Sequence, residues 1–166
     1  GGVIHNVSSI ISHEDFSLKT VKNDIALMHL SDPITVNSHA GVVDLAEEDF
    51  DLEEGSVVQI SGWGATRNVN ETNQNLRFVE VVVQDQQKCA KAYKKHKLSI
   101  TENQYCAGTA AGDKDSCTGD SGGPSTYEGV QVGIVSYGKG CARAKYPGVY
   151  TKISKYRQWS RIHTGI

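Results

Sequence analysis

One stretch of the sequence carries a serine whose neighbours suit nucleophilic chemistry. Ser121 lies in the run Gly119-Asp120-Ser121-Gly122-Gly123-Pro124. A serine hydroxyl attacks a carbonyl only when a base removes its proton, and the intermediate then needs backbone N–H donors aimed at its oxyanion. Gly119 lets the backbone turn so that two N–H groups converge. A glycine-rich surface turn is the alternative, but the nearby Cys117 and Asp115 argue against it.

The serine run resembles the active-serine loop of the chymotrypsin–trypsin family of serine proteases, in which the catalytic residues follow the order His, Asp, Ser. The resemblance extends over almost the whole chain, and its C-terminal third is most similar to arthropod trypsins. Four further segments resemble the triad-aspartate segment, the turn before the second barrel's long loop, the substrate-binding strand and the pocket wall: Asn23 to Leu27, Ser61 to Gly64, Gly133 to Gly138 and Tyr146 to Tyr150.

The resemblance implies a role for each catalytic position. Ser121 would be the nucleophile, and Asp24 would orient and support the histidine imidazolium. The N–H groups of Gly119 and Ser121 would form the oxyanion hole. On its own, Asp24 would be interpreted as a turn residue before an apolar strand, so its assignment depends on the distant serine motif.

The resemblance also implies a specificity pocket for arginine or lysine. Asp115 would lie at its base, where a carboxylate can bind a guanidinium or an ammonium. Gly138 and Gly148 would leave room for a long side chain at the walls. Ser136 and Gly138 would hydrogen-bond the substrate backbone as an added antiparallel strand. A surface acid beside Lys114 is the alternative interpretation of Asp115.

Two residues depart from the family pattern near this pocket. Ser125 follows Pro124 where the family usually has an apolar residue, and we expect it to loosen the packing of its strand slightly. Tyr137 replaces a more common tryptophan and would shape the neighbouring subsites.

The histidine of the triad is not found in the sequence. The resemblance places it in an Ala-Ala-His-Cys-type motif well upstream of Asp24, and nothing before Asp24 matches that motif. His5 and His13 are too close to Asp24, and the remaining histidines follow it: His29, His39, His96 and His163. We assign the general base to none of them, and we predict that this chain alone is inactive.

Asp120 is the second position where the family pattern is incomplete. In the family, cleavage of a zymogen creates an N-terminal ammonium that pairs with this aspartate and orders the oxyanion hole. The start Gly1-Gly2-Val3-Ile4 does not match the expected Ile-Val-Gly-Gly. The resemblance therefore implies a zymogen-like, disordered oxyanion hole.

The four cysteines suggest two disulfides formed in an oxidising compartment. A zinc site is the alternative, although no CxxC pair and no histidine at knuckle spacing accompany them. The residues alone leave three pairings open. The resemblance implies the pairs Cys89 with Cys106 and Cys117 with Cys141.

Composition limits the classes of partner. A net charge of -2 gives no reason to expect nucleic acid or an anionic membrane, and no apolar run reaches the ~20 residues of a membrane span. We expect a secreted, extracellular glycoprotein with N-glycosylation sequons at Asn6 and Asn70 and no metal or cofactor. Its expected partners are peptides and proteins with Arg or Lys, and protein protease inhibitors. The catalytic histidine would lie in a missing upstream segment or on a second chain.

Short β-like runs separated by polar loops predict an all-β fold rather than βαβ units. The predicted strands are Ile25 to Leu30, Val57 to Ile60, Leu76 to Val83, Val130 to Val135 and Val149 to Ile153. Helical spacing predicts helices at Asp85 to Lys95 and at Ser154 to His163, the second with Ser154 as its cap.

The predicted architecture is a trypsin-like double β-barrel with the first barrel incomplete, in one peptidase domain over residues 1–166. Residues 1–33 would be the remainder of the first barrel, 34–54 a surface connector with solvated acids, 55–153 the second barrel and 154–166 the C-terminal helix. An incomplete barrel leaves strand edges unpaired, so we expect poor stability. Two other functions stay open: a non-enzymatic protease homologue that acts as a binding module, and an inactive structural fragment.

Overall fold

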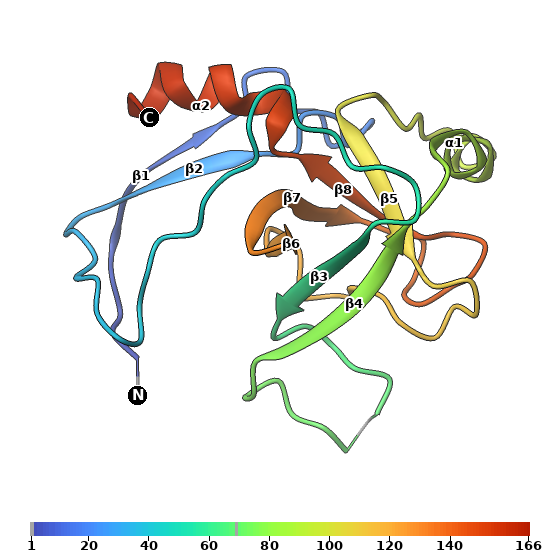
Figure 1. Cartoon of the computed structure of the whole chain (residues 1–166), viewed down its shortest axis with the longest axis horizontal. Helices are drawn as coiled ribbons and strands as arrows, with labels where there is room; N and C mark the ends of the chain where they lie inside the picture. The colour runs from blue at the N-terminus through green and yellow to red at the C-terminus, as the bar shows by residue number, and fades with distance from the viewer. Residues whose placement is uncertain (1, 69) are drawn as a thin grey trace.

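The computed structural model describes residues 2–68 and 70–166. Gly1 lies outside the described residues. It is the first residue of the predicted first-barrel remainder and of the Gly1-Gly2-Val3-Ile4 start discussed above. The chain forms two groups of strands and a C-terminal helix (Figure 1). The elements are β1 (Val7–Ser12), β2 (Ala26–Leu30), β3 (Val57–Gly62), β4 (Arg77–Val83), α1 (Gln86–Lys94), β5 (Gln104–Gly108), β6 (Pro124–Tyr127), β7 (Val130–Tyr137), β8 (Gly148–Lys152), the 3-10 helix η1 (Ser154–Tyr156) and α2 (Arg157–Thr164).

The larger group of strands is a closed antiparallel barrel with the order β3, β4, β5, β8, β7, β6. Alternate residues of each strand point inward, as the period of two requires. On β3, Val58 and Ile60 are buried while Val57 and Gln59 are exposed. Buried side chains from the other strands complete this core, among them Val81, Val83, Tyr105, Ala107, Val132, Val135 and Tyr150.

The smaller group is the antiparallel pair β1 and β2 near the N-terminus. Its inner side packs on the end of the chain, because Ile25 forms a buried cluster with Tyr156 and Trp159. The Trp159 indole N–H donates to Glu14 Oε2 at 2.9 Å, and the His13 ring stacks on Trp159 at 5.2 Å. The all-β prediction, with one barrel, a remaining sheet and a C-terminal helix, is confirmed. None of the described helices is long and apolar enough to cross a bilayer.

The connector, residues 34–54, does more than pass over the surface. Leu45 forms a parallel bridge with Gln131, and the neighbouring Ala46 is buried in the barrel core. Phe50 and Leu52 pack against the same core. The acids of this segment are exposed, and apolar side chains between them anchor it to the barrel. The proposed domain boundaries stay predictions.

Several local expectations need correction. The strands β1, β5 and β6 were not predicted, because their polar residues obscure the alternation that marks a strand. Ser154 begins η1 rather than an α-helix, and no side chain caps either η1 or α2. The predicted helix at Asp85 to Lys95 is confirmed as α1, with the Asp85 carboxylate accepting the Lys88 N–H at 2.6 Å.

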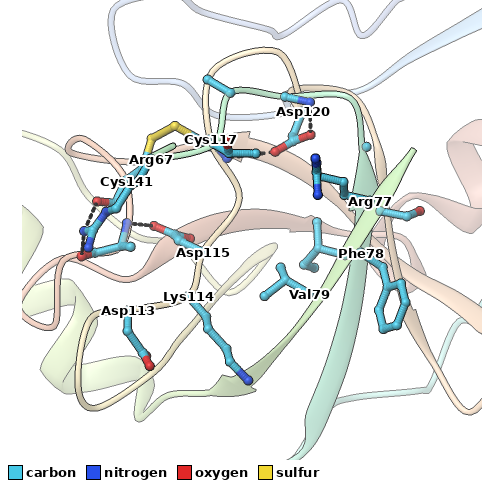
Figure 2. Close-up of a pocket in the computed structure, with 17 residues that line it drawn as sticks. Arg67, Arg77, Phe78, Val79, Asp113, Lys114, Asp115, Cys117, Asp120 and Cys141 are labelled. Carbon is cyan, nitrogen blue, oxygen red and sulfur yellow. Dashed lines mark hydrogen bonds between the residues drawn. A yellow bond between two sulfur atoms is a disulfide. The ribbon is translucent and has the colours of Figure 1, made fainter. Parts of the chain in front are cut away.

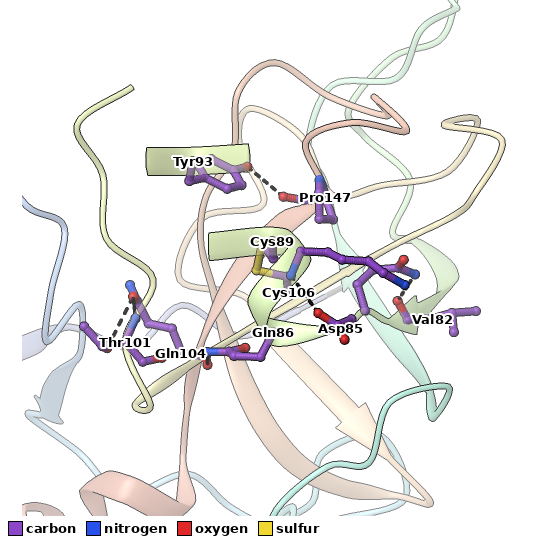
Figure 3. Close-up of a disulfide and its surroundings, with 11 residues drawn as sticks. Val82, Asp85, Gln86, Cys89, Tyr93, Thr101, Gln104, Cys106 and Pro147 are labelled. Carbon is purple, nitrogen blue, oxygen red and sulfur yellow. Dashed lines mark hydrogen bonds between the residues drawn. A yellow bond between two sulfur atoms is a disulfide. The ribbon is translucent and has the colours of Figure 1, made fainter. Parts of the chain in front are cut away.

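The Cys89–Cys106 disulfide fastens α1 to β5 (Figure 3). Next to it, the Gln86 side-chain amide donates to the carbonyls of Thr101 and Gln104 at 2.8 and 2.9 Å. At the other end of the helix, the buried Tyr93 hydroxyl donates to the Pro147 carbonyl at 2.7 Å. The helix is therefore attached to the segment that leads into β8, which forms a wall of the pocket described below.

Ser125 has a hydrogen-bond partner that the sequence did not predict, and the pairing of β6 with β7 is irregular between Ser125 and Thr126. The Ser125 side chain is fully buried in the barrel, and the Tyr105 hydroxyl donates to its Oγ at 2.6 Å. Tyr105 in turn stacks on Tyr150 at a ring distance of 5.2 Å. A hydrogen bond replaces the apolar contact that the family usually has there, so the buried hydroxyl is satisfied.

This pair predicts a non-additive effect on stability. Tyr105→Phe removes the partner of the buried Ser125 hydroxyl and should lower the free energy of unfolding by about 1–3 kcal/mol. Adding Ser125→Ala should recover most of that loss, because both polar groups are then absent. Urea unfolding of the single and double variants measures this, and additive losses would show that the hydrogen bond is not the cause.

Candidate active site

The loop around Ser121 is a series of tight turns between β5 and β6. Gly119 and Gly122 have φ values of +99° and +81°, which favour glycine. The Gly122 N–H donates to the Val135 carbonyl at 2.8 Å, which ties the loop to β7. Among the described residues, the backbone N–H groups of Gly119 and Ser121 donate to no carbonyl, and their role in an oxyanion hole stays a prediction.

The Asp120 carboxylate is inserted into a cradle of backbone. Its Oδ1 accepts the Gly64 N–H at 2.7 Å, and its Oδ2 accepts the Cys117 N–H at 2.9 Å. A Cβ added at Gly62 or Gly64 would overlap this carboxylate, so the segment Ser61 to Gly64 needs its glycines. Figure 2 shows Asp120 pointing toward Cys117 above a cavity.

This geometry bears on the expected disorder of the oxyanion hole. That expectation rested on the lack of a matching N-terminal start that could supply an ammonium to Asp120. Two backbone N–H groups hold its carboxylate here, and hydrogen bonds to a charged acceptor are among the stronger ones in proteins. These two N–H groups therefore hold the aspartate that precedes the nucleophile. The zymogen-like disorder of the oxyanion hole stays a prediction.

Asp24 is brought from the N-terminal sheet to the edge of the barrel. The Ser136 hydroxyl donates to Asp24 Oδ2 at 2.6 Å, and the Thr151 hydroxyl donates to the Asp24 carbonyl at 2.9 Å. The preceding Asn23 has a φ of +54°, and its side-chain oxygen accepts the Tyr156 hydroxyl at 2.8 Å. Side chains of β7, β8 and η1 therefore hold the turn that carries the carboxylate.

A pocket of about 280 Å³ opens beside Ser121. It brings together the predicted residues Asp115, Ser121, Ser136, Gly138 and Gly148. A Cβ at Gly148 would lie 2.8 Å from Asp115 Oδ1, so a side chain there would press on the carboxylate. The Cys117–Cys141 disulfide joins the nucleophile loop to the opposite wall. Both disulfides are the pairs that the resemblance implied, and they exclude a zinc site that uses these thiols.

Asp115 is half-buried in this pocket. Its oxygens accept the N–H groups of Ser116 at 2.9 Å and Ala142 at 2.8 Å. Burial is the largest influence and raises the pKa of the Asp115 carboxyl to about 6, while the two N–H donors and the Arg67 charge act in the opposite direction. A cation that enters the pocket would compensate the negative charge of the ionised Asp115 carboxylate and so favour its ionised form.

A second cavity, of about 250 Å³, shares Asp115, Cys117 and Cys141 with this pocket and is also lined by Asp120 (Figure 2). Arg67 lines it and donates to the carbonyls of Cys141 and Ala142, which ties the loop after β3 to the pocket wall. Sequence reasoning missed Arg67, since no periodicity or motif marks its loop.

Several histidines take part in aromatic packing or in hydrogen bonds away from Ser121 and Asp24. His13 and His163 pack against Trp159, and the His29 ring bonds to the Ser8 hydroxyl. Among the described residues, no hydrogen bond joins any histidine to Ser121 or Asp24. The described residues also hold no cluster of three or more histidine, cysteine or acidic side chains that could bind a metal. The position of the general base stays a prediction.

Comparison with known proteins agrees with this geometry. A family model described as Trypsin matches residues 1–160. Trypsin 5G1 of Aedes aegypti is 38% identical over 169 residues, covering the whole chain and 62% of that protein. A trypsin of Simulium vittatum is 43% identical over 150 residues, covering 90% of this chain and 60% of that protein. A vitellin-degrading protease of Bombyx mori is 37% identical over 158 residues, covering 95% and 60%.

These relatives are considerably longer than the chain. It spans about three fifths of the length of the curated proteins that it matches.

The Asp120 cradle predicts a large effect from a nearly isosteric change. Asp120→Asn replaces one acceptor oxygen by an NH₂ group, which would face a backbone N–H donor. The free energy of unfolding should fall by about 2–4 kcal/mol. Urea unfolding measures this, with the exposed Asp32→Asn as the matched control. An unchanged Asp120→Asn protein would mean that the cradle does not hold the loop.

Proposed function

This chain belongs to the trypsin family, and we propose that it supplies the nucleophile, the oxyanion hole and the specificity pocket of a serine endopeptidase. The observation that carries the proposal is the convergence of Ser121, Asp24 and Asp115 on one pocket. Ser121 and Asp115 line it, and Asp24 is bonded to Ser136 in its wall. A binding module would not need all three.

The proposed reaction is acyl transfer through the serine. The Ser121 Oγ attacks the carbonyl carbon of the peptide bond while its proton passes to the imidazole of a histidine, which Asp24 orients and stabilises. The N–H groups of Gly119 and Ser121 stabilise the oxyanion. The C–N bond breaks as the imidazolium protonates the leaving amine, and water then hydrolyses the acyl-enzyme by the same route.

The catalytic histidine is proposed to lie in an upstream segment or on a second chain. The greater length of the matched relatives supports this placement. Without that histidine this chain is proposed to be inactive, because Ser121 then has no general base.

Selectivity for arginine or lysine is proposed from the pocket base. The half-buried Asp115 carboxylate can pair with a guanidinium or an ammonium, and Gly138 and Gly148 leave its approach free of side chains. The proposed partners are therefore peptides and proteins with exposed basic residues, and protein inhibitors that mimic them. Secretion, glycosylation at the sequons and activation from a zymogen are proposed with it, supported by the two disulfides.

Cleavage by the native protein tests the proposal. Fluorogenic peptides with Arg or Lys before the cut should be hydrolysed, and matched peptides with Leu or Asp should not. Ser121→Ala should lower kcat by about 10⁴-fold or more, as loss of the nucleophile does in this mechanism. The exposed Ser99→Ala is the control. Equal cleavage after Leu would overturn the selectivity, and an unaffected Ser121→Ala would overturn the mechanism.

Binding of benzamidine, an aryl amidinium, tests the pocket without catalysis. Above about pH 6 the Asp115 carboxyl is ionised and can pair with the cation, whereas at lower pH its proton must be displaced. The association constant should therefore be constant near pH 8 and fall about tenfold per pH unit well below 6. Calorimetry measures it, and Asp115→Asn should remove both the affinity and the pH dependence. Asp113→Asn is the matched control, and its retention of both is expected.

A further inference from the structure

A group of basic and aromatic side chains follows the strand that is proposed to pair with the substrate. Lys139 comes directly after Gly138, and its Nζ lies 2.8 Å from His96 Nδ1 and 2.7 Å from His96 Nε2. The same ammonium is 5.2 Å from the centre of the Tyr146 ring, and the Lys145 ammonium is 5.8 Å from it. These four residues are referred to as the basic cluster.

The basic cluster rests on an aromatic support. The Tyr146 ring contacts His96 edge-on at 5.3 Å and the buried Tyr93 at 5.9 Å. Tyr93 is fixed by its hydrogen bond to the Pro147 carbonyl and belongs to α1, which the Cys89–Cys106 disulfide anchors. Lys139 is therefore held on a preformed surface, so binding there costs less side-chain entropy.

The positive charge of the basic cluster is not neutralised. Among the described residues, none of its lysines has a carboxylate within 4.0 Å, whereas Lys152 pairs with Asp51 at 2.7 Å. Burial, followed by the charges of Lys139, Lys145 and Lys95, lowers the pKa of His96. A neutral His96 can accept one hydrogen bond from the Lys139 ammonium through its unprotonated ring nitrogen, which orients the ammonium.

The position of the cluster relative to a bound substrate is inferred from the proposed function, on which this step rests. If the residue before the cut pairs with Ser136, an antiparallel strand places the residue two positions upstream at Gly138. β7 ends at Tyr137, and Lys139 follows it in a bend directly after Gly138. An ammonium at this position would be within reach of substrate side chains three or four residues before the cut, counting the basic residue as the first.

We propose that Lys139, oriented by His96 and Tyr146, binds the carboxylate of an acidic substrate residue at this third or fourth position. The favoured substrates would then carry Asp or Glu upstream and Arg or Lys at the cut. The two charges would be recognised by oppositely charged parts of one cleft, Asp115 in the pocket and Lys139 at the outer end of the substrate strand. Such an arrangement selects one register of the peptide.

Two peptide series test the inference. Acetyl-X-Ala-Ala-Arg and acetyl-Ala-X-Ala-Arg, each with an aminomethylcoumarin leaving group, are compared with X as Glu, Gln or Lys. The kcat/KM of the native protein should be about two- to fivefold higher for Glu than for Gln in at least one series, the gain of a partly exposed ion pair. Lys should be worse than Gln, and the difference should shrink in 0.5 M NaCl. Labelled amides of the same peptides, titrated into the Ser121→Ala protein, give the corresponding Kd ratios without cleavage.

Variants assign the effect. Lys139→Gln should bring the Glu to Gln ratio close to one, and Lys139→Glu should invert it, whereas Lys155→Gln on η1 should keep it. Cleavage after Arg with no dependence on X, or a ratio unchanged in Lys139→Gln, would overturn this inference and leave the proposed function intact. No cleavage but a Glu preference in binding that Lys139→Gln abolishes would support the inference and count against the proposed enzyme. Equal Kd values for all X would refute the subsite in either case.

Discussion

The hydrogen bond from the Ser136 hydroxyl to the Asp24 carboxylate joins segments 112 residues apart in the sequence. It fixes the N-terminal sheet against the barrel at the place where the chemistry would occur. Its geometry depends on β7 being held in the closed barrel and on the turn at Asn23 being held by Tyr156. The barrel therefore acts as the rigid part, and the residues from the small sheet are positioned by it.

Three aspartates with the same side chain differ in their hydrogen-bond donors and in their burial. Asp120 accepts two N–H groups from the turns around it and serves to fix the nucleophile loop. Asp115 also accepts two, but it is half-buried at a pocket, and burial raises its pKa. Asp24 accepts a serine hydroxyl. The structural anchor Asp120, the proposed cation receptor Asp115 and the proposed support for an imidazolium, Asp24, thus differ by their surroundings rather than by their residue type.

The two departures from the family pattern differ in how well they are accommodated, because the buried Tyr137 hydroxyl has no hydrogen-bond partner among the described residues. A buried serine at position 125 would cost stability alone, but the Tyr105 hydroxyl satisfies it. Tyr137 lies edge-on to Tyr93 at 5.7 Å, within the same aromatic group that supports the basic cluster. These ring contacts connect Tyr137, which lines the pocket with Asp115, to the basic cluster that is proposed to bind an acidic substrate residue.

The amino-acid sequence by itself determined the family, the all-β class, most of the longer strands, α1 and the residues of the pocket. These follow from contiguous motifs such as the run around Ser121 and from local periodicity, both of which depend on neighbours in the chain. The connector's anchoring at Ala46, the cradle around Asp120, the tether of Arg67 and the pairing of Lys139 with His96 were decided only by the tertiary structure. Each joins side chains or N–H groups from segments far apart in sequence. Local sequence patterns do not encode such contacts, because they exist only once the barrel has closed.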